Sequence, residues 1–156
     1  MKIKHGLTMT EILLVLAILS VMTIAVVVGM DPIGAMAKGR DAQRKKDLNR
    51  IKTAFEEYFS DRNCFPNQNI VDQLGLEANC KGNTFSPWLS TWPCDPGGSP
   101  YPIVVGDDQN CPKWFKVMTN LENKRDAQIF DQGGIGTSLG IPVNYGVSSG
   151  NLSNTR

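Results

Sequence analysis

The stretch Gly6-Leu7-Thr8-Met9-Thr10-Glu11 is followed at once by an apolar run, residues 12–30, and this junction decides how the rest of the chain is interpreted. Within the run only Ser20 and Thr23 carry side-chain hydroxyls, and no residue is charged. At about 1.5 Å of rise per residue, a helix of this length approaches the roughly 30 Å hydrocarbon core of a bilayer. Placing an ionisable group at the start of a membrane-spanning helix costs free energy, so Glu11 is a candidate functional residue that needs a partner of opposite charge.

The flank before the run contains Lys2 and Lys4 and no acid. Because basic residues beside a membrane segment stay on its cytoplasmic side, we expect a single pass of the cytoplasmic (inner) membrane, with the head outside. The only histidine, His5, lies in this flank, so the head has no imidazole for a metal site or a catalytic pair. The sequence therefore predicts a protein that is not an enzyme, with catalysis by carboxylates alone left open.

All four cysteines, Cys64, Cys80, Cys94 and Cys111, follow the apolar run at separations of 16, 14 and 17 residues. Zinc sites use closer pairs, so this spacing does not suit them. An even number of cysteines beyond a membrane segment indicates disulfides in an oxidising compartment, with four reduced thiols as the alternative. Of the three pairings that four cysteines allow, we predict nearest neighbours, Cys64 with Cys80 and Cys94 with Cys111, each adding ~3 kcal/mol.

Residues 38–61 are predicted to form an amphipathic helix, because apolar side chains recur on one face at Leu48, Ile51, Phe55, Tyr58 and Phe59. Residues 38–50 hold six basic and two acidic side chains, although the whole chain has a net charge of only +1. This patch fits contact with DNA or lipid, or a solvated face that meets acidic surfaces of neighbouring subunits. The balanced total charge makes no general case for nucleic acid, which is not expected as a partner.

Three interpretations of the apolar segment compete. A cleavable secretory signal is one, since Ala35-Met36-Ala37 offers a small-x-small site, but the run exceeds the usual length of about 7 to 15 residues. A plain signal anchor is another, and it explains the length and the lysines. Neither interpretation explains why a glutamate lies directly before the apolar run.

The third interpretation accounts for Glu11. Residues 6–19 resemble the prepilin signature of type IV pilins and of the pseudopilins of type II secretion: a short basic leader ending in glycine, a hydrophobic residue, a threonine, and a glutamate at the fifth mature position. The resemblance implies that a prepilin peptidase cleaves after Gly6 and methylates the new amine of Leu7. It also assigns Thr8 and Glu11 to the segment that directs assembly. Leu7 stands where phenylalanine is commoner, which mainly alters the methylated residue.

A filament would give the Glu11 carboxylate a partner. When subunits stack helix on helix, the N-terminal ammonium of one subunit can meet Glu11 of its neighbour. A misplaced subunit leaves both charges bare, and removing one partner of such a buried pair typically costs ~3–5 kcal/mol. We therefore assign Glu11 to subunit registry, and cleavage after Gly6 creates the amine that it needs.

These features divide the chain into a leader (1–6), a transmembrane or filament-core helix (7–31), an amphipathic helix (32–61) and a globular α/β head (62–156) with a polar tail. Pro32 marks a helix break, or the first turn of the second helix. In the head we expect a short helix within 71–78, two strands near 103–105 and 113–118, a last short strand within 144–149, and a glycine-rich loop at 134–140. The turn Asp95-Pro96-Gly97-Gly98-Ser99-Pro100-Tyr101 resembles the turn that precedes the small sheet of major-pseudopilin-like heads.

The predicted fold class is α+β: a long N-terminal helix, kinked near Pro32, packed on a small antiparallel sheet with disulfide-tied loops. The resemblance implies a structural subunit of a pilus-like filament, made as a membrane-inserted prepilin and finally located in a periplasmic or extracellular filament. Its partners would be identical or related subunits, the prepilin peptidase, a membrane assembly platform with a cytoplasmic ATPase, and membrane lipid before assembly. The alternatives are a pseudopilin of a secretion or DNA-uptake system and a membrane-anchored extracytoplasmic binding domain.

No cofactor is expected. Glu122, Asp126 and Asp131 are available as calcium ligands, but the glycine-rich acidic loop that binds calcium in major pseudopilins is not recognisable here.

Overall fold

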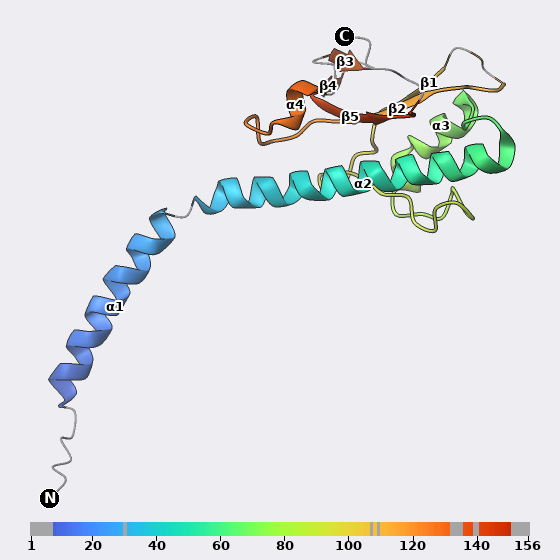
Figure 1. Ribbon diagram of the computed structural model, residues 1–156. Coiled ribbons are helices and arrows are strands. Elements are labelled where there is room, and N and C mark those ends of the chain that lie inside the picture. Colours follow the sequence, from blue (N-terminus) through green and yellow to red (C-terminus); the bar gives the residue numbers. More distant parts are fainter. Residues whose placement is uncertain are drawn as a thin grey trace, which may run out of the picture. The chain divides into compact units, whose positions relative to one another are not determined.

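The computed structural model describes residues 8–29, 31–106, 108, 110–131, 136–138 and 141–150. The chain forms two compact units, Met1–Met36 and Ala37–Arg156. The longer helices precede an antiparallel sheet in the sequence, and only the short α4 lies between strands (Figure 1), so the predicted α+β class is confirmed.

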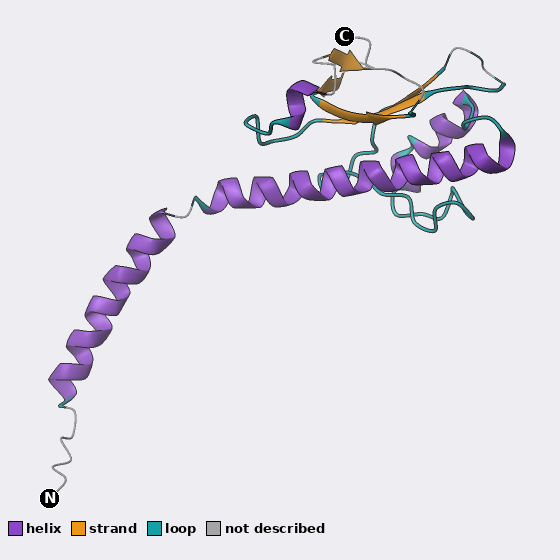
Figure 2. Cartoon of the chain, in the orientation of Figure 1, coloured by secondary structure: helices purple, strands orange, loops and turns teal. Residues whose placement is uncertain are grey.

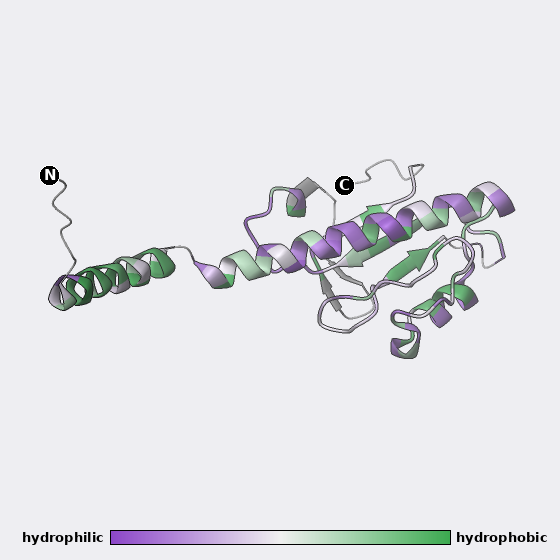
Figure 3. Ribbon diagram, turned by 90° about the horizontal axis from the view of Figure 1, so that it is seen from below, coloured by the Kyte–Doolittle hydropathy of each residue, from purple (hydrophilic) through white to green (hydrophobic). Residues whose placement is uncertain are grey.

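Helix α1 spans Met9–Gly29 and contains 21 residues. It is predominantly apolar, as its mainly green colour in Figure 3 shows, and none of its residues is buried. Among the described residues it is the one helix long and apolar enough to cross a membrane, a property that a signal sequence near the N-terminus would share. The sequence expectation of a membrane-length helix is therefore met, whereas its placement in a membrane remains a prediction.

A second helix, α2, spans Pro32–Arg62 and begins shortly after α1 ends. Asp31 stands at this junction with a positive φ of 42°, a conformation that few non-glycine residues adopt. Its Oδ1 accepts a hydrogen bond from the Gly34 N–H over 3.2 Å, and its carbonyl oxygen accepts from the Ala35 N–H over 3.1 Å. Asp31 is thus the N-cap of α2, and Pro32 occupies the first helical position, where its missing N–H costs nothing.

In the head, α2 lies along one face of a three-stranded antiparallel sheet (Figure 2). The sheet has the order β1-β2-β5, formed by β1 (Ile103–Val105), β2 (Phe115–Thr119) and β5 (Tyr145–Ser148). Its register sets Val117 opposite both Ile103 and Val147. These strands lie where the sequence pattern predicted them.

The apolar face of α2 and the sheet enclose the core. Leu48, Ile51 and Phe55 are fully buried, and the Phe55 ring meets the Phe115 ring edge-on at 5.0 Å. Gly146 is needed opposite β2, because a Cβ atom there would lie 2.9 Å from the Val117 carbonyl oxygen. The predicted apolar face is therefore confirmed at these three positions, while Tyr58 and Phe59 are half-buried against the same core, in which aromatic pairs supply much of the packing.

Smaller elements complete the head. Helix α3 (Gln68–Leu74) is capped by the Asn67 side chain, and the 3-10 helix η1 (Glu77–Asn79) follows it. Helix α4 spans Gln128–Asp131, and β3 (Gly136–Ser138) pairs with β4 (Ile141–Val143) in a separate two-stranded sheet. The expectation of a glycine-rich loop at 134–140 was wrong at residues 136–138, which form β3. A three-residue strand has too few side chains to show the alternation of apolar and polar residues that predicts a strand.

The disulfides join Cys64 to Cys111 and Cys80 to Cys94, with Cα atoms 4.9 and 5.6 Å apart. The presence of disulfides is therefore confirmed, and no cysteine is free. The predicted pairing of Cys64 with Cys80 and of Cys94 with Cys111 was wrong.

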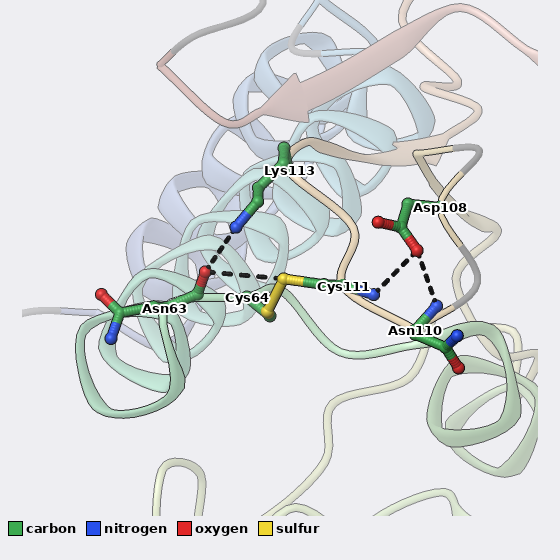
Figure 4. The surroundings of a disulfide bond; sticks show 6 residues. All are labelled: Asn63, Cys64, Asp108, Asn110, Cys111 and Lys113. Atoms are coloured by element: carbon green, nitrogen blue, oxygen red, sulfur yellow. Dashed lines mark hydrogen bonds between the residues drawn. A yellow bond between two sulfur atoms is a disulfide. The ribbon is translucent and has the colours of Figure 1, made fainter.

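Backbone contacts between distant segments explain the observed pairing. Beside Cys64, the Phe65 N–H donates to the Pro112 carbonyl oxygen over 2.9 Å, so the exit of α2 lies against the segment before β2. Figure 4 shows Lys113 Nζ donating to the Asn63 carbonyl oxygen over 2.9 Å at the same place. Cys80 and Cys94 are aligned similarly, because the Lys81 N–H donates to the Trp92 carbonyl oxygen over 2.9 Å.

Candidate functional site

Thr8 caps the N-terminal end of α1. Its carbonyl oxygen accepts hydrogen bonds from the N–H groups of Glu11 and Ile12 over 3.1 and 3.2 Å. The same Glu11 N–H also donates to Thr8 Oγ1 over 3.3 Å, a contact typical of an N-cap threonine. Gly6 and Leu7, the predicted processing site, lie outside the described residues.

Glu11 lies in the first turn of α1 and is exposed. A carboxylate is favourable at a helix N-terminus because it faces the positive end of the helix dipole. Within the described part of the chain, however, no cation approaches it, while its neighbours Ile12, Leu14 and Val15 are exposed apolar side chains. The full charge of Glu11 therefore still needs a partner whenever this surface is removed from water.

The hydroxyls of Ser20 and Thr23, along the middle of α1, are satisfied inside the helix. Ser20 Oγ donates to the Ala17 carbonyl oxygen over 2.8 Å, and Thr23 Oγ1 donates to the Leu19 carbonyl oxygen over 2.7 Å. Such back-bonding makes a hydroxyl compatible with an apolar environment. Glu11 is the one charged side chain of α1, and the helix contains no basic residue that could pair with it.

A charge cluster joins α2 to two loops of the head. Arg44 Nη1 donates to Asp41 Oδ1 and to Glu122 Oε1, each over 2.8 Å, and the Arg44 guanidinium also binds the Asp95 carboxylate through Nε and Nη2. Asp41 in turn accepts the backbone N–H groups of Glu122 and Asn123 over 2.9 and 2.8 Å. Since Arg44 and Asp41 are buried, this cluster fixes both loops against α2.

The electrostatics of the cluster favour the charged forms. Hydrogen bonds from Arg40 and Arg44 lower the pKa of Glu122 from 4.5 to about 2. The pKa of Arg44 is raised, chiefly by its hydrogen bonds to Asp95, although burial works in the opposite direction. Glu122 and Arg44 therefore remain ionised over the physiological pH range.

The turn at residues 95–101 is attached to α2 at both of its ends. Asp95 binds Arg44, while the Tyr101 hydroxyl donates to the buried Asp47 carboxylate over 3.3 Å. Burial and the nearby Asp47 carboxylate raise the pKa of Tyr101. Arg44 and Asp47 are neighbours on one helix face, so this turn docks along about one turn of α2.

The basic patch of α2 is partly neutralised within the same chain. Lys45 Nζ lies 2.6 Å from Asp126 Oδ2 and 5.4 Å from the centroid of the Tyr145 ring. With Arg40 bound to Glu122 and Arg44 in its cluster, three of the six basic residues within 38–50 have carboxylate partners in the head. The sequence could have suggested a local Asp41–Arg44 pair from its i,i+3 spacing, but not the loops that complete the cluster.

The acids considered for calcium are otherwise engaged. Glu122 binds Arg40 and Arg44, and the hydrogen bond from Lys45 lowers the pKa of Asp126. The side chain of Asp131 lies outside the described residues. In the portion of the chain that is described, no three histidine, cysteine, aspartate or glutamate side chains come together as a metal site.

Comparisons with protein-family models, with curated proteins and with solved structures give no match for this chain.

Proposed function

We propose that the chain is a type IV pilin-like filament subunit, made as a membrane-inserted prepilin and assembled through its N-terminal helix. The observation that carries the proposal is α1: 21 residues, none of them buried, with one carboxylate in the first turn. An apolar surface of that size requires lipid or other protein around it. A filament core supplies the second environment, and it also supplies the cation that Glu11 lacks.

In this proposal the prepilin peptidase removes residues 1–6 and methylates Leu7. The ammonium of Leu7 in one subunit then pairs with Glu11 of a neighbouring subunit, so that an incorrectly placed subunit buries two bare charges. Thr8 supports this step by fixing the first turn of α1, where Glu11 is placed. The charge cluster around Arg44 holds the head on α2, so the head moves with the helix.

The test replaces Glu11 by glutamine and by alanine in cells that assemble the wild-type chain. Loss of one partner of a buried charge pair costs ~3–5 kcal/mol, which predicts a fall of more than about 100-fold in incorporation into sheared filaments. Removal of the leader should be unchanged, as measured by mass spectrometry of the mature N-terminus. Glu56→Gln, which removes an exposed carboxylate from α2, is the matched control and should incorporate normally.

The same mass spectra separate the proposal from its rivals. A chain that starts at methylated Leu7 supports the filament subunit. An intact Met1 would instead indicate a membrane-anchored extracytoplasmic domain, and a start at Lys38 would indicate a secreted protein released at Ala35-Met36-Ala37. If Glu11→Ala enters filaments as well as the wild-type chain does, Glu11 does not set the registry of the subunits, even when the leader is cleaved.

A further inference from the structure

Leu76 is the one large hydrophobic side chain that is strongly exposed among the described residues of the head, with 55% of its surface accessible. All the other exposed large apolar side chains lie between Met9 and Met36. A single exposed leucine is ordinary on a protein surface, so its meaning depends on how it is presented and on what could receive it.

Leu76 is presented on a rigid turn. Its N–H donates to the Gln73 carbonyl oxygen over 3.2 Å, and its carbonyl oxygen accepts from the Asn79 N–H over 3.0 Å. The Cys80–Cys94 disulfide anchors the turn four residues later. Glu77 follows directly and is exposed, so the turn offers an apolar side chain with a negative charge beside it. Little conformational entropy would be lost when such a turn binds.

A groove on α2 has the complementary properties. It has a volume of about 460 Å³, and its lining combines the apolar residues Ala54, Trp88 and Leu89 with polar and charged side chains of α2. Lys46 and Arg50 line one end of it, and Glu57 lines the other. The cationic end is available, since Lys46 makes no hydrogen bond or ion pair with a described residue and Arg50 approaches Asp47 only to 3.9 Å.

The wall of the groove is also rigid. Trp88 Nε1 donates to Asp61 Oδ2 over 2.7 Å, and its ring meets the Tyr58 ring edge-on at 4.6 Å. A hydrophobic anchor at a protein interface is commonly received by apolar side chains that are held in place and surrounded by polar groups, and Trp88 and Leu89 are such side chains in this groove.

We infer that Leu76 of one copy inserts into the α2 groove of a second copy, where Glu77 pairs with Lys46 and Arg50. Leu76 and the groove are different surfaces of the same molecule, so the contact is heterologous. Such a contact adds subunits without limit when the rotation that relates successive subunits does not close them into a ring. That property is what a filament requires, and in this respect the inference rests on the proposed function. Glu57 at the far end of the groove repels Glu77 and so sets the direction of docking.

The experiment co-expresses two single-cysteine variants of the full chain, Leu76→Cys and Thr53→Cys, with Thr53 lining the groove. All four native cysteines are in disulfides, so the introduced thiols are the only free ones. After mild oxidation of assembled filaments, we expect a dimer that forms only when both variants are present. Replacing Thr53→Cys by Glu56→Cys, an exposed position of α2 outside the groove, should give about tenfold less dimer. Equal dimer from both combinations, or dimer from Leu76→Cys alone, would overturn the inference.

Charge exchange gives an independent readout. Glu77→Lys should weaken filament assembly, and adding Lys46→Glu and Arg50→Glu should restore it, a recovery that a merely misfolded variant would not show. Filaments that depend on Glu11 but give neither the 53–76 dimer nor this recovery would refute the head contact while leaving the proposed function intact. Absence of any filament would refute the proposed function, and the head contact with it.

Discussion

Arg44 and Glu122 are 78 residues apart in the sequence, yet Arg44 Nη1 lies 2.8 Å from Glu122 Oε1. The same guanidinium binds Asp41 and Asp95, so one side chain of α2 fixes the turn before β1 and the segment after β2. The head is therefore attached to its helix by an electrostatic contact in addition to its apolar core.

Replacing Arg44 by alanine should destabilise the head by about 2–3 kcal/mol, because Asp41 would be left buried without its cation while Asp95 and Glu122 can still reach water. The measurement is urea unfolding of the full chain in detergent, followed by the fluorescence of Trp88, Trp92 and Trp114, which all lie in the head. Arg40→Ala is the matched control, since Arg40 also binds Glu122 but is exposed. A loss for Arg40→Ala as large as that for Arg44→Ala would contradict the assigned role of burial.

Glu122 should make head stability depend on pH in the acid range. Its pKa is lowered to about 2 in the folded chain from an ordinary value of 4.5. A lowered pKa means that the contribution is complete above pH 4.5 and is lost as the pH falls toward 2. Urea midpoints measured from pH 7 to pH 2 should therefore decline below about 4.5, with a shallower decline in Glu122→Gln. Identical profiles for the two chains would show that other groups carry the effect.

The two disulfides should contribute unequally. Cys64–Cys111 spans 47 residues and Cys80–Cys94 spans 14, so the chain-entropy relation predicts losses of about 4 and about 3 kcal/mol when each pair is replaced by alanine. Unfolding midpoints of the two double variants measure the difference. Peptide mapping of the unreduced wild-type chain provides the check on connectivity, and a Cys64–Cys80 peptide would contradict the observed pairing.

Two glycines of α2 should respond differently to alanine. At Gly39 a Cβ atom would have open space, so Gly39→Ala should stabilise the helix by about 0.5–1 kcal/mol. At Gly34 the Cβ atom would lie within 3 Å of the Asp31 carboxylate, and loss of that cap costs about 1 kcal/mol, which offsets the gain. Hydrogen exchange of the α2 amides in detergent would separate the two variants, and equal protection would refute the capping role of Asp31.

Much of the fold follows from local patterns. The recurrence of Leu48, Ile51 and Phe55 identified the buried face of α2, and short apolar runs identified β1 and β2, because such patterns depend on nearest neighbours along the chain. The disulfide pairing did not follow, since it depends on the exit of α2 lying beside residues 111–113. The partners of Arg44 were equally hidden, because Asp95 and Glu122 come from loops without any periodic signal.

In the candidate sites too, some residues could be identified from the sequence and others could not. Thr8 and Glu11 were identified from sequence because a charge before an apolar run is conspicuous without any tertiary information. The α2 groove with Trp88 and Leu89 could not be predicted, since its lining is assembled from segments more than 30 residues apart.

The internal hydrogen bonds of Ser20 and Thr23 have a kinetic consequence. Moving α1 from one apolar surrounding to another exchanges van der Waals neighbours and breaks no hydrogen bond of these hydroxyls. The barrier to such a transfer therefore has no polar desolvation component along the middle of the helix.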